Sequence, residues 1–299
     1  MYLLARQDTA AQEQNPFKLY HYDPTIAGAV VMLLLFLGTT ILHFWQLVRA
    51  RCWFILPLAI GGILEFIGYA ARCKSGFESP DWTLGPYIIQ AILLLVAPSL
   101  FAATIYMQLG RIIVLLHGES RALIRKQWLT KIFVTGDVLS FVLQGGGGGY
   151  QAAGTLDALN NGSKVIIGGL FVQLIFFGIF IAVAVAFDLS IRKNPTQQSG
   201  THAVWRKHMW AMYIGSALIM VRSAFRVIEY LQGFNGYLLS HEAYLYIFDA
   251  VLMFLVMALF NYVHPSEVVA LIVQDEREYK MGALTQNIHH HERLHSDYP

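Results

Sequence analysis

The chain has 299 residues, of which 56 % are hydrophobic and 13 % are charged, and its net charge at pH 7 is +2. Soluble domains carry about 25 % charged residues, so this composition indicates a protein that lies in a lipid bilayer. The small net charge argues against a nucleic-acid partner, and the length leaves no room for a soluble catalytic domain beside about seven membrane spans.

Residues 1–24 form a short polar N-terminal segment without an apolar run long enough for a signal-peptide core. Apolar runs of about 20 residues, each able to cross a membrane as a helix, then follow one another at 25–48, 53–72, 86–110, 128–149, 164–188, 207–232 and 243–263. They predict an all-α fold, a polytopic seven-transmembrane helix bundle over residues 25–264, followed by a tail at 265–299.

The fourth run is the weakest of the seven. Lys131, Asp137 and Gln144 interrupt it, and the five glycines at 145–149 close it. Each glycine costs about 1 kcal/mol relative to alanine in a helix, which predicts a segment that is either unwound or closely packed.

The direction of the spans follows from the Lys and Arg residues between them. Placing the N-terminus outside and the C-terminus in the cytoplasm puts most of these residues on the cytoplasmic side, as the positive-inside rule requires. The two cysteines, Cys52 and Cys73, flank the second span, so they are too far apart to form a disulfide within one chain.

Polar side chains recur within the spans at helical spacing. The candidate substrate-binding residues are Glu65, Tyr69, Asp137, Gln144, Gln173, Arg222, Arg226, Glu229, Tyr246 and Asp249. Each ionisable one costs about 2.5 to 3.5 kcal/mol at the centre of a membrane helix, and counting helical turns places several at one level in the outer half. Two interpretations remain equally open: ion pairs that only lock the bundle, or one polar site for a head group, where an excess of acids would suit an amine.

No enzyme motif, cofactor motif or protein-partner motif appears. A seven-span zinc hydrolase would need three zinc ligands facing one cavity, whereas His43 is the one histidine well inside a span, and the tail tract 289–291 fits a solvated tail better than a metal site. A receptor shares the predicted topology but not the usual helix ends. The sequence contains no phosphate-binding loop, which argues against transport driven directly by ATP.

The sequence resembles the fungal lipid-translocating exporter family, also called the RTA-like proteins. The residues that carry the resemblance are Tyr22-Asp23-Pro24, Glu65, Gly68-Tyr69, Arg72, Ala97-Pro98, Gly136-Asp137, Gln144, Arg222-Ser223, Phe225-Arg226, Glu229-Tyr230, His241-Glu242, Tyr246, Asp249 and His264-Pro265. The resemblance implies an integral protein of the fungal plasma membrane that exports or translocates amphipathic lipid-like molecules such as sphingoid bases, sterol-like toxins or porphyrins. A lipid sensor or receptor is the alternative.

Overall fold

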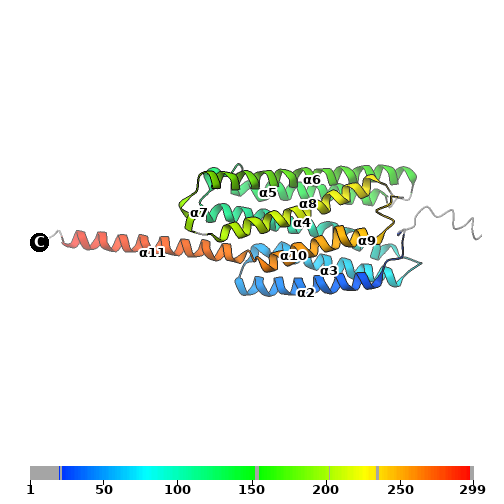
Figure 1. The fold of residues 1–299 in the computed structure, drawn as a ribbon, viewed down its shortest axis with the longest axis horizontal. Coiled ribbons are helices and arrows are strands. Elements are labelled where there is room, and N and C mark those ends of the chain that lie inside the picture. Colours follow the sequence, from blue (N-terminus) through cyan, green and yellow to red (C-terminus); the bar gives the residue numbers. More distant parts are fainter. Residues whose placement is uncertain (1–19, 21, 152–154, 202, 234–235, 297–299) are drawn as a thin grey trace, which may run out of the picture.

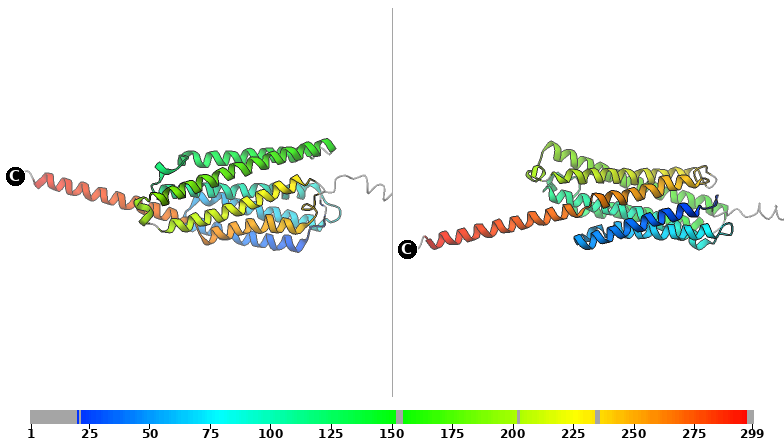
Figure 2. Two further views of the ribbon diagram at one scale, coloured as in Figure 1. Left: turned by 45° about the horizontal axis from the view of Figure 1, so that its top comes forward. Right: turned by 60° about the horizontal axis from the view of Figure 1, so that its bottom comes forward.

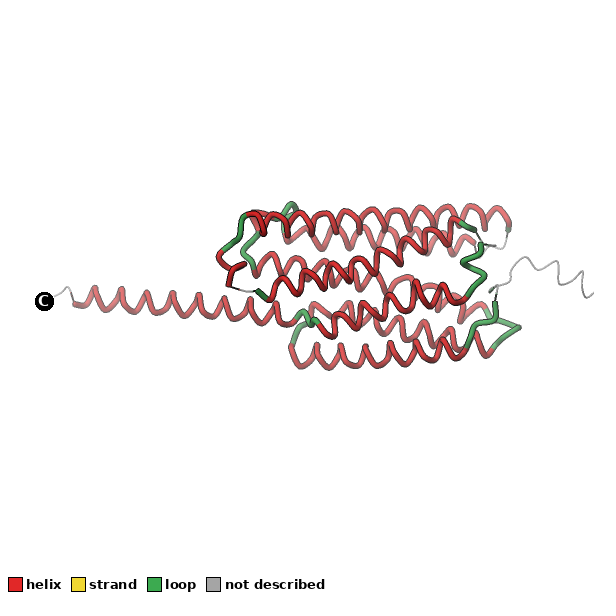
Figure 3. Tube along the Cα trace, viewed as in Figure 1, coloured by secondary structure: helices red, strands yellow, loops and turns green. Residues whose placement is uncertain are grey.

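The computed structural model describes residues 20, 22–151, 155–201, 203–233 and 236–296, and these form helices and no β-strand (Figures 1 and 3). The side chains of 156, 159 and 282–296 are also outside the description. The side chains of the histidine tract at 289–291 and most of the N-terminal segment therefore lie outside the description.

A helix covers each of the seven apolar runs. The helices are α2 (Ile26–Ala50), α3 (Leu56–Phe77), α4 (Leu84–Leu115), α5 (Lys126–Gln151), α6 (Leu156–Lys193), α8 (Val204–Leu231) and the continuous stretch α9 (Glu242–Leu245), η3 (Tyr246–Val251) and α10 (Leu252–Tyr262). Shorter elements are η1 (Trp53–Ile55), η2 (Glu119–Arg121) and α7 (Gln197–Thr201), and α11 (Ser266–Ser296) follows.

The turn between α2 and α3 shows how local sequence sets the helix ends. Arg51 ends α2 in the left-handed conformation, with φ at 50°, and the N–H of Cys52 donates to the oxygen of Leu47 at 3.2 Å. This pattern satisfies carbonyl groups that the last helical turn leaves free. Pro57 then lies in the first turn of α3, where a missing N–H costs nothing.

The bundle has an apolar exterior. Large hydrophobic side chains such as Val31, Leu34 and Trp45 on α2 are more than half exposed, while polar side chains such as Glu65 and Asp249 are buried. Within the described residues six helical stretches are long and apolar enough to cross a membrane, and α5 is not among them. Apolar surface on this scale indicates an integral membrane protein.

The helices lie roughly parallel in a bundle (Figures 1 and 2). The pair α5 and α6 lies at one side, α2 and α3 lie at the other, and α4, α8 and α10 run between them. The start of α2 and α9 lie at one end and α7 at the opposite end, from which α11 projects (Figure 1). The first turns of α11 pack against α4, where Val268 is buried, so the predicted tail begins as a helix attached to the bundle.

The glycine run does not unwind α5, which continues as a helix to Gln151. Of the two predicted possibilities, close packing applies to Gly147, because a Cβ there would come within 2.7 Å of the Gly162 oxygen on α6. The other four glycines of the run have no neighbour within 4 Å of a Cβ. The two cysteines are buried and unpaired, as their spacing predicted.

Candidate functional site

An ion pair between α8 and η3 lies in the interior of the bundle. Arg222 donates from Nε to Oδ1 of Asp249, and its Nη2 donates to the backbone oxygen of Leu94 on α4 at 2.7 Å. Both charged side chains are almost completely buried. The Leu94 oxygen is available because Pro98, four residues later in α4, has no N–H to donate to it. Pro98 thus leaves an acceptor free for the arginine.

Asp249 lies in a stretch of π-helix. The segment η3 interrupts the helix that runs from Glu242 to Tyr262, and Asp249 is buried within it. A π-helical turn adds a residue to the turn and shifts the side chains that follow, and such turns occur frequently at functional sites. Sequence spacing alone did not predict this irregularity.

Glu65 and Tyr69 approach this ion pair from α3. Glu65 is 1 % exposed, and its charge interacts with those of Asp249 and Arg222. Neither Oε1 of Glu65 nor the hydroxyl of Tyr69 has a hydrogen-bond partner among the described residues. The Tyr69 ring stacks between Phe36 and Tyr246, with ring centroids 5.5 and 6.4 Å away. The site therefore contains buried polar atoms that the protein itself leaves unsatisfied.

Arg226 and Glu229 form a second pair one turn further along α8. Nη1 of Arg226 donates to Oε2 of Glu229 at 2.7 Å, and the Glu229 side chain is buried. The guanidinium carbon also lies 5.6 Å from the centre of the Tyr230 ring, a cation–π contact. The charges of this pair interact with Asp249, so it belongs to the same electrostatic cluster.

A third pair closes the end of the bundle near the N-terminus. The fully buried Arg72 donates to Oε1 of Glu242 at 2.6 Å, to Tyr246 at 3.2 Å and to Tyr22 at 3.0 Å. Glu242 in turn accepts from the backbone N–H of Thr25 at 2.9 Å. Burial raises the pKa of Tyr22, which precedes the first helix, although Arg72 opposes that shift, so the phenol stays neutral.

The candidate residues did not include Arg72 or Glu242. Their signal was present in the sequence, because Arg72 lies on the stripe of Glu65 and Tyr69, and Glu242 lies on that of Tyr246 and Asp249. The contribution of the N-terminal segment had no such signal, since a single tyrosine before a helix has no periodicity.

The charges in this region nearly balance. Three arginines each have a carboxylate partner, in the pairs Arg222–Asp249, Arg226–Glu229 and Arg72–Glu242. Glu65 forms no ion pair among the described residues, although it interacts with the Arg222–Asp249 pair. The region therefore has one acid more than its arginines neutralise if every group is ionised.

Three of the candidate residues lie apart from this cluster. Gln144 on α5 donates to Ser140 at 2.6 Å and to Gln173 of α6 at 3.3 Å, and Ser140 donates to the Gly169 oxygen at 2.7 Å. Asp137 is on the same helix and is also buried. Tyr106 of α4 is the polar group that interacts with the Asp137 carboxyl group, whereas the three arginines do not interact with it. The structure thus separates the predicted single site into an ion-pair cluster and an α5–α6 group.

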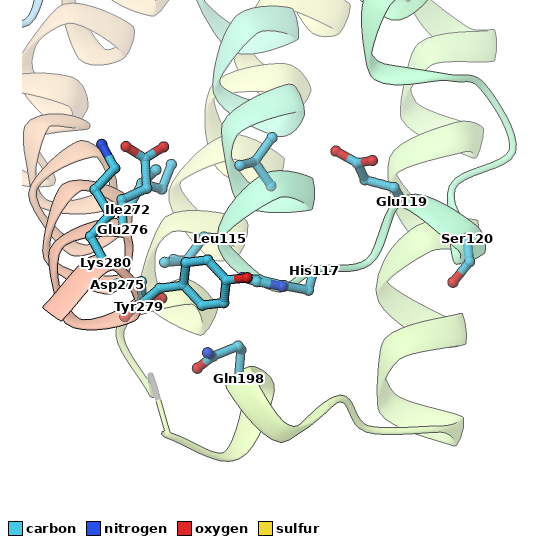
Figure 4. Close-up of a pocket in the computed structure, with 11 residues that line it drawn as sticks. Leu115, His117, Glu119, Ser120, Gln198, Ile272, Asp275, Glu276, Tyr279 and Lys280 are labelled. Carbon is cyan, nitrogen blue, oxygen red and sulfur yellow. The ribbon is translucent and has the colours of Figure 1, made fainter. Parts of the chain in front are cut away.

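A cavity of about 660 Å³ lies at the end of the bundle from which α11 projects (Figure 4). Leu115 and His117 at the end of α4 line one side, and Ile272, Asp275 and Tyr279 of α11 line the other. Charged and apolar side chains both contribute to it. Sequence analysis did not predict it, because it depends on the position of α11.

No group of three metal-ligating side chains occurs in the part of the chain that the structure describes. Nε2 of His43 donates to the Met257 backbone oxygen at 3.0 Å, which is a structural contact between α2 and α10.

Comparisons with known proteins agree with the resemblance noted in the sequence. The family model described as RTA1 like protein matches residues 58–271. The chain is 36 % identical over 280 residues to protoporphyrin uptake protein 1 of Saccharomyces cerevisiae, covering 82 % of this chain and 91 % of that protein. It is 36 % identical over 278 residues to protein RTA1 of the same yeast, covering 84 % and 86 % of the two chains.

A third relative is the sphingoid long-chain base transporter RSB1 of Saccharomyces cerevisiae, which is 25 % identical over 277 residues, covering 81 % of this chain and 72 % of that protein. No solved structure matches the chain. The family model covers more than half of the sequence and includes all three arginine–carboxylate pairs of the cluster. The chain belongs to the RTA1-like family of fungal membrane proteins.

Proposed function

We propose that this protein translocates or exports amphipathic lipid-like molecules across the fungal plasma membrane and so confers tolerance to them. Sphingoid bases, sterol-like toxins and porphyrins are the substrate classes. Two relatives carry names that refer to movement of such compounds, a sphingoid long-chain base transporter and a protoporphyrin uptake protein. The proposal includes no catalytic step and no cofactor.

The topology that goes with this proposal has seven spans, with α5 as the fourth. Although α5 is less apolar than the other six, it packs along α6 over its length, so much of its polar surface faces protein. In the proposed topology the N-terminus lies outside and the C-terminus, with α11, lies in the cytoplasm. The ion-pair cluster then lies in the outer half of the bundle. Epitope tags at the two termini, probed on intact and permeabilised cells, test this topology, and two accessible tags on intact cells would contradict it.

The observation that carries the proposal is the unpaired Glu65 beside the Arg222–Asp249 pair. A buried carboxylate without a partner is costly, and a ligand that supplies a cation would remove that cost. We therefore assign Glu65 to the head-group site for an amine, with Tyr69 and Tyr246 beside it and Arg226–Glu229 at its edge. The apolar surfaces of the neighbouring helices would accommodate the tail.

Reconstitution into liposomes tests this assignment. The rate at which a fluorescent sphingoid base moves between leaflets is measured for the wild type, Glu65→Gln and the matched control Glu119→Gln, which alters an exposed acid at the opposite end. We expect Glu65→Gln to slow the exchange at least tenfold, equivalent to about 1.4 kcal/mol, and the control to have no effect. An N-acylated analogue without the amine should be insensitive to Glu65→Gln.

A lipid sensor or receptor is the alternative function. The same assay separates it from a transporter, because a sensor would bind the labelled base without accelerating its exchange between leaflets. A Glu65→Gln protein that exchanges the base at the wild-type rate would contradict the head-group site itself.

A further inference from the structure

Asp137 is a buried carboxylic acid that the ion-pair cluster does not use. It is 4 % exposed, and neither Oδ1 nor Oδ2 makes a hydrogen bond of full geometry among the described residues. Buried polar groups without partners are rare in folded proteins, and those that occur often have a functional role. Asp137 therefore requires a physical explanation separate from that of the arginine pairs.

The elements packed against Asp137 supply no cation. Tyr106 of α4 is the titratable group that acts on it: the phenol and the carboxyl group face each other as hydrogen-bonding partners, although they do not reach the geometry of a full hydrogen bond. On α6, Phe176 packs against the neighbouring Gly136. The charged residue next along α5, Lys131, lies nearer the start of the helix, where its ammonium contacts the Trp128 ring at 5.5 Å. The environment of the carboxyl group is thus apolar apart from one phenol.

The nearest polar group on the same face of α5 is also committed elsewhere. Ser140 donates its proton to the Gly169 oxygen at 2.7 Å and accepts from Gln144. It has no second hydrogen to donate to Asp137. The phenyl rings of Phe133, Phe177 and Phe180 surround Tyr106, with centroids 5.4, 6.0 and 4.5 Å away, so the phenol that acts on Asp137 lies in an aromatic cage.

The chemistry of this cage selects its ligand. A hard metal cation takes about six or more oxygen ligands, whereas one carboxylate and one phenol are present. An ionised carboxylate without a partner costs several kcal/mol in apolar surroundings, whereas a protonated carboxyl group is neutral and can donate to the Tyr106 oxygen. A proton is the cation that fits.

We propose that Asp137 is a proton-binding site that couples amphiphile movement to a proton gradient. The inference rests on the proposed function, since it names the ion that drives the same transport. The proton binds to a carboxylate oxygen from one side of the membrane, forming an O–H bond, and that bond breaks when the proton leaves toward the other side; no bond between heavy atoms changes. The two unpaired acids then have different ligands, an amine at Glu65 and a proton at Asp137.

Transport by reconstituted protein tests the coupling. The exchange rate of the labelled sphingoid base is measured with and without a proton gradient, for the wild type, Asp137→Asn and the control Asp157→Asn, which alters an exposed acid in the first turn of α6. We expect the gradient to change the rate at least threefold for the wild type and the control, and to have no effect for Asp137→Asn. A wild type that exchanges the base but ignores the gradient would overturn the coupling and leave the proposed function intact.

Infrared spectroscopy provides a readout that does not depend on transport. A protonated carboxyl group has a carbonyl stretching band distinct from that of a carboxylate, and this band shifts in heavy water. We expect Asp137→Asn to remove one component of this band at neutral pH, and Asp157→Asn to leave it unchanged. An unchanged band in Asp137→Asn would overturn the proton site, whether or not the protein transports.

Absence of exchange by the wild type would refute the proposed function, and the infrared result would still decide the proton site.

Discussion

The two polar regions of this bundle treat buried acids in opposite ways. Between α3, α8, α9 and η3, Asp249, Glu229 and Glu242 each lie within 4 Å of an arginine nitrogen, and Glu65 is the one acid there without an ion pair among the described residues. Between α5 and α6, Asp137 has no charged partner in the described structure. The difference teaches that buried carboxylates in membrane helices fall into two kinds: one that is paired across two helices ties them together, as Asp249 and Glu242 do, and an unpaired one is available to a ligand.

The largest expected effect is on the paired region. Changing Arg222 to Leu leaves Asp249 buried without its partner and leaves the Leu94 oxygen without its donor. Breaking a buried ion pair in this way lowers the free energy of unfolding by about 3 to 5 kcal/mol. Thermal unfolding in detergent should show a large drop in Tm. The double variant Arg222→Leu with Asp249→Leu should recover much of it, because no charge is left unpaired. Equal losses in the single and double variants would show that the pair does not act as a unit.

The pair near the N-terminus should have a smaller effect. Glu242→Gln removes the charge that Arg72 and the N–H of Thr25 share, and hydrogen bonds to charged groups contribute about 1.5 to 3 kcal/mol. We expect lower thermal stability and faster proteolysis in the N-terminal segment. Lys74→Gln, which changes an exposed charge on α3, the helix of Arg72, is the control and should have no effect on either measurement.

The unpaired region should respond in the opposite direction. Asp137→Leu replaces an unsatisfied polar group by an apolar one of similar size, which should stabilise the fold by about 1 to 3 kcal/mol. Its Tm in detergent should exceed that of the wild type, whereas Asp249→Leu alone should lower it. A lower Tm for Asp137→Leu would mean that Asp137 has a structural partner, which would remove the contrast between the two regions.

The smallest effects concern the glycine run on α5. Gly147→Ala should destabilise by about 1 to 3 kcal/mol, because its Cβ would overlap the Gly162 oxygen and Ile166 of α6. Gly145→Ala has open space around its Cβ and should stabilise the helix by up to about 1 kcal/mol. The two unfolding midpoints should therefore move in opposite directions. Equal shifts would contradict the close contact of α5 with α6.

Sequence reasoning located the helices well, since their apolar runs are local features about one membrane thickness long. It also selected Glu65, Arg222 and Asp249, because ionisable residues inside such runs stand out. It wrongly predicted a single polar site, because the polar stripes of two helices can face different neighbours. Asp137 shares a helical stripe with Gln144, as Glu65 does with Tyr69, but periodicity does not say toward which neighbour a stripe points.

The amino-acid sequence by itself determined the membrane environment, the positions of the helices and the family, because these depend on hydrophobicity and on residue order. Only the tertiary structure decided which acid has an arginine partner, that Pro98 frees the Leu94 oxygen for Arg222, and that Asp137 lies apart from the cluster. The physical reason is that charge pairing acts over a few ångströms between helices that are distant in sequence, and helix packing alone sets those distances.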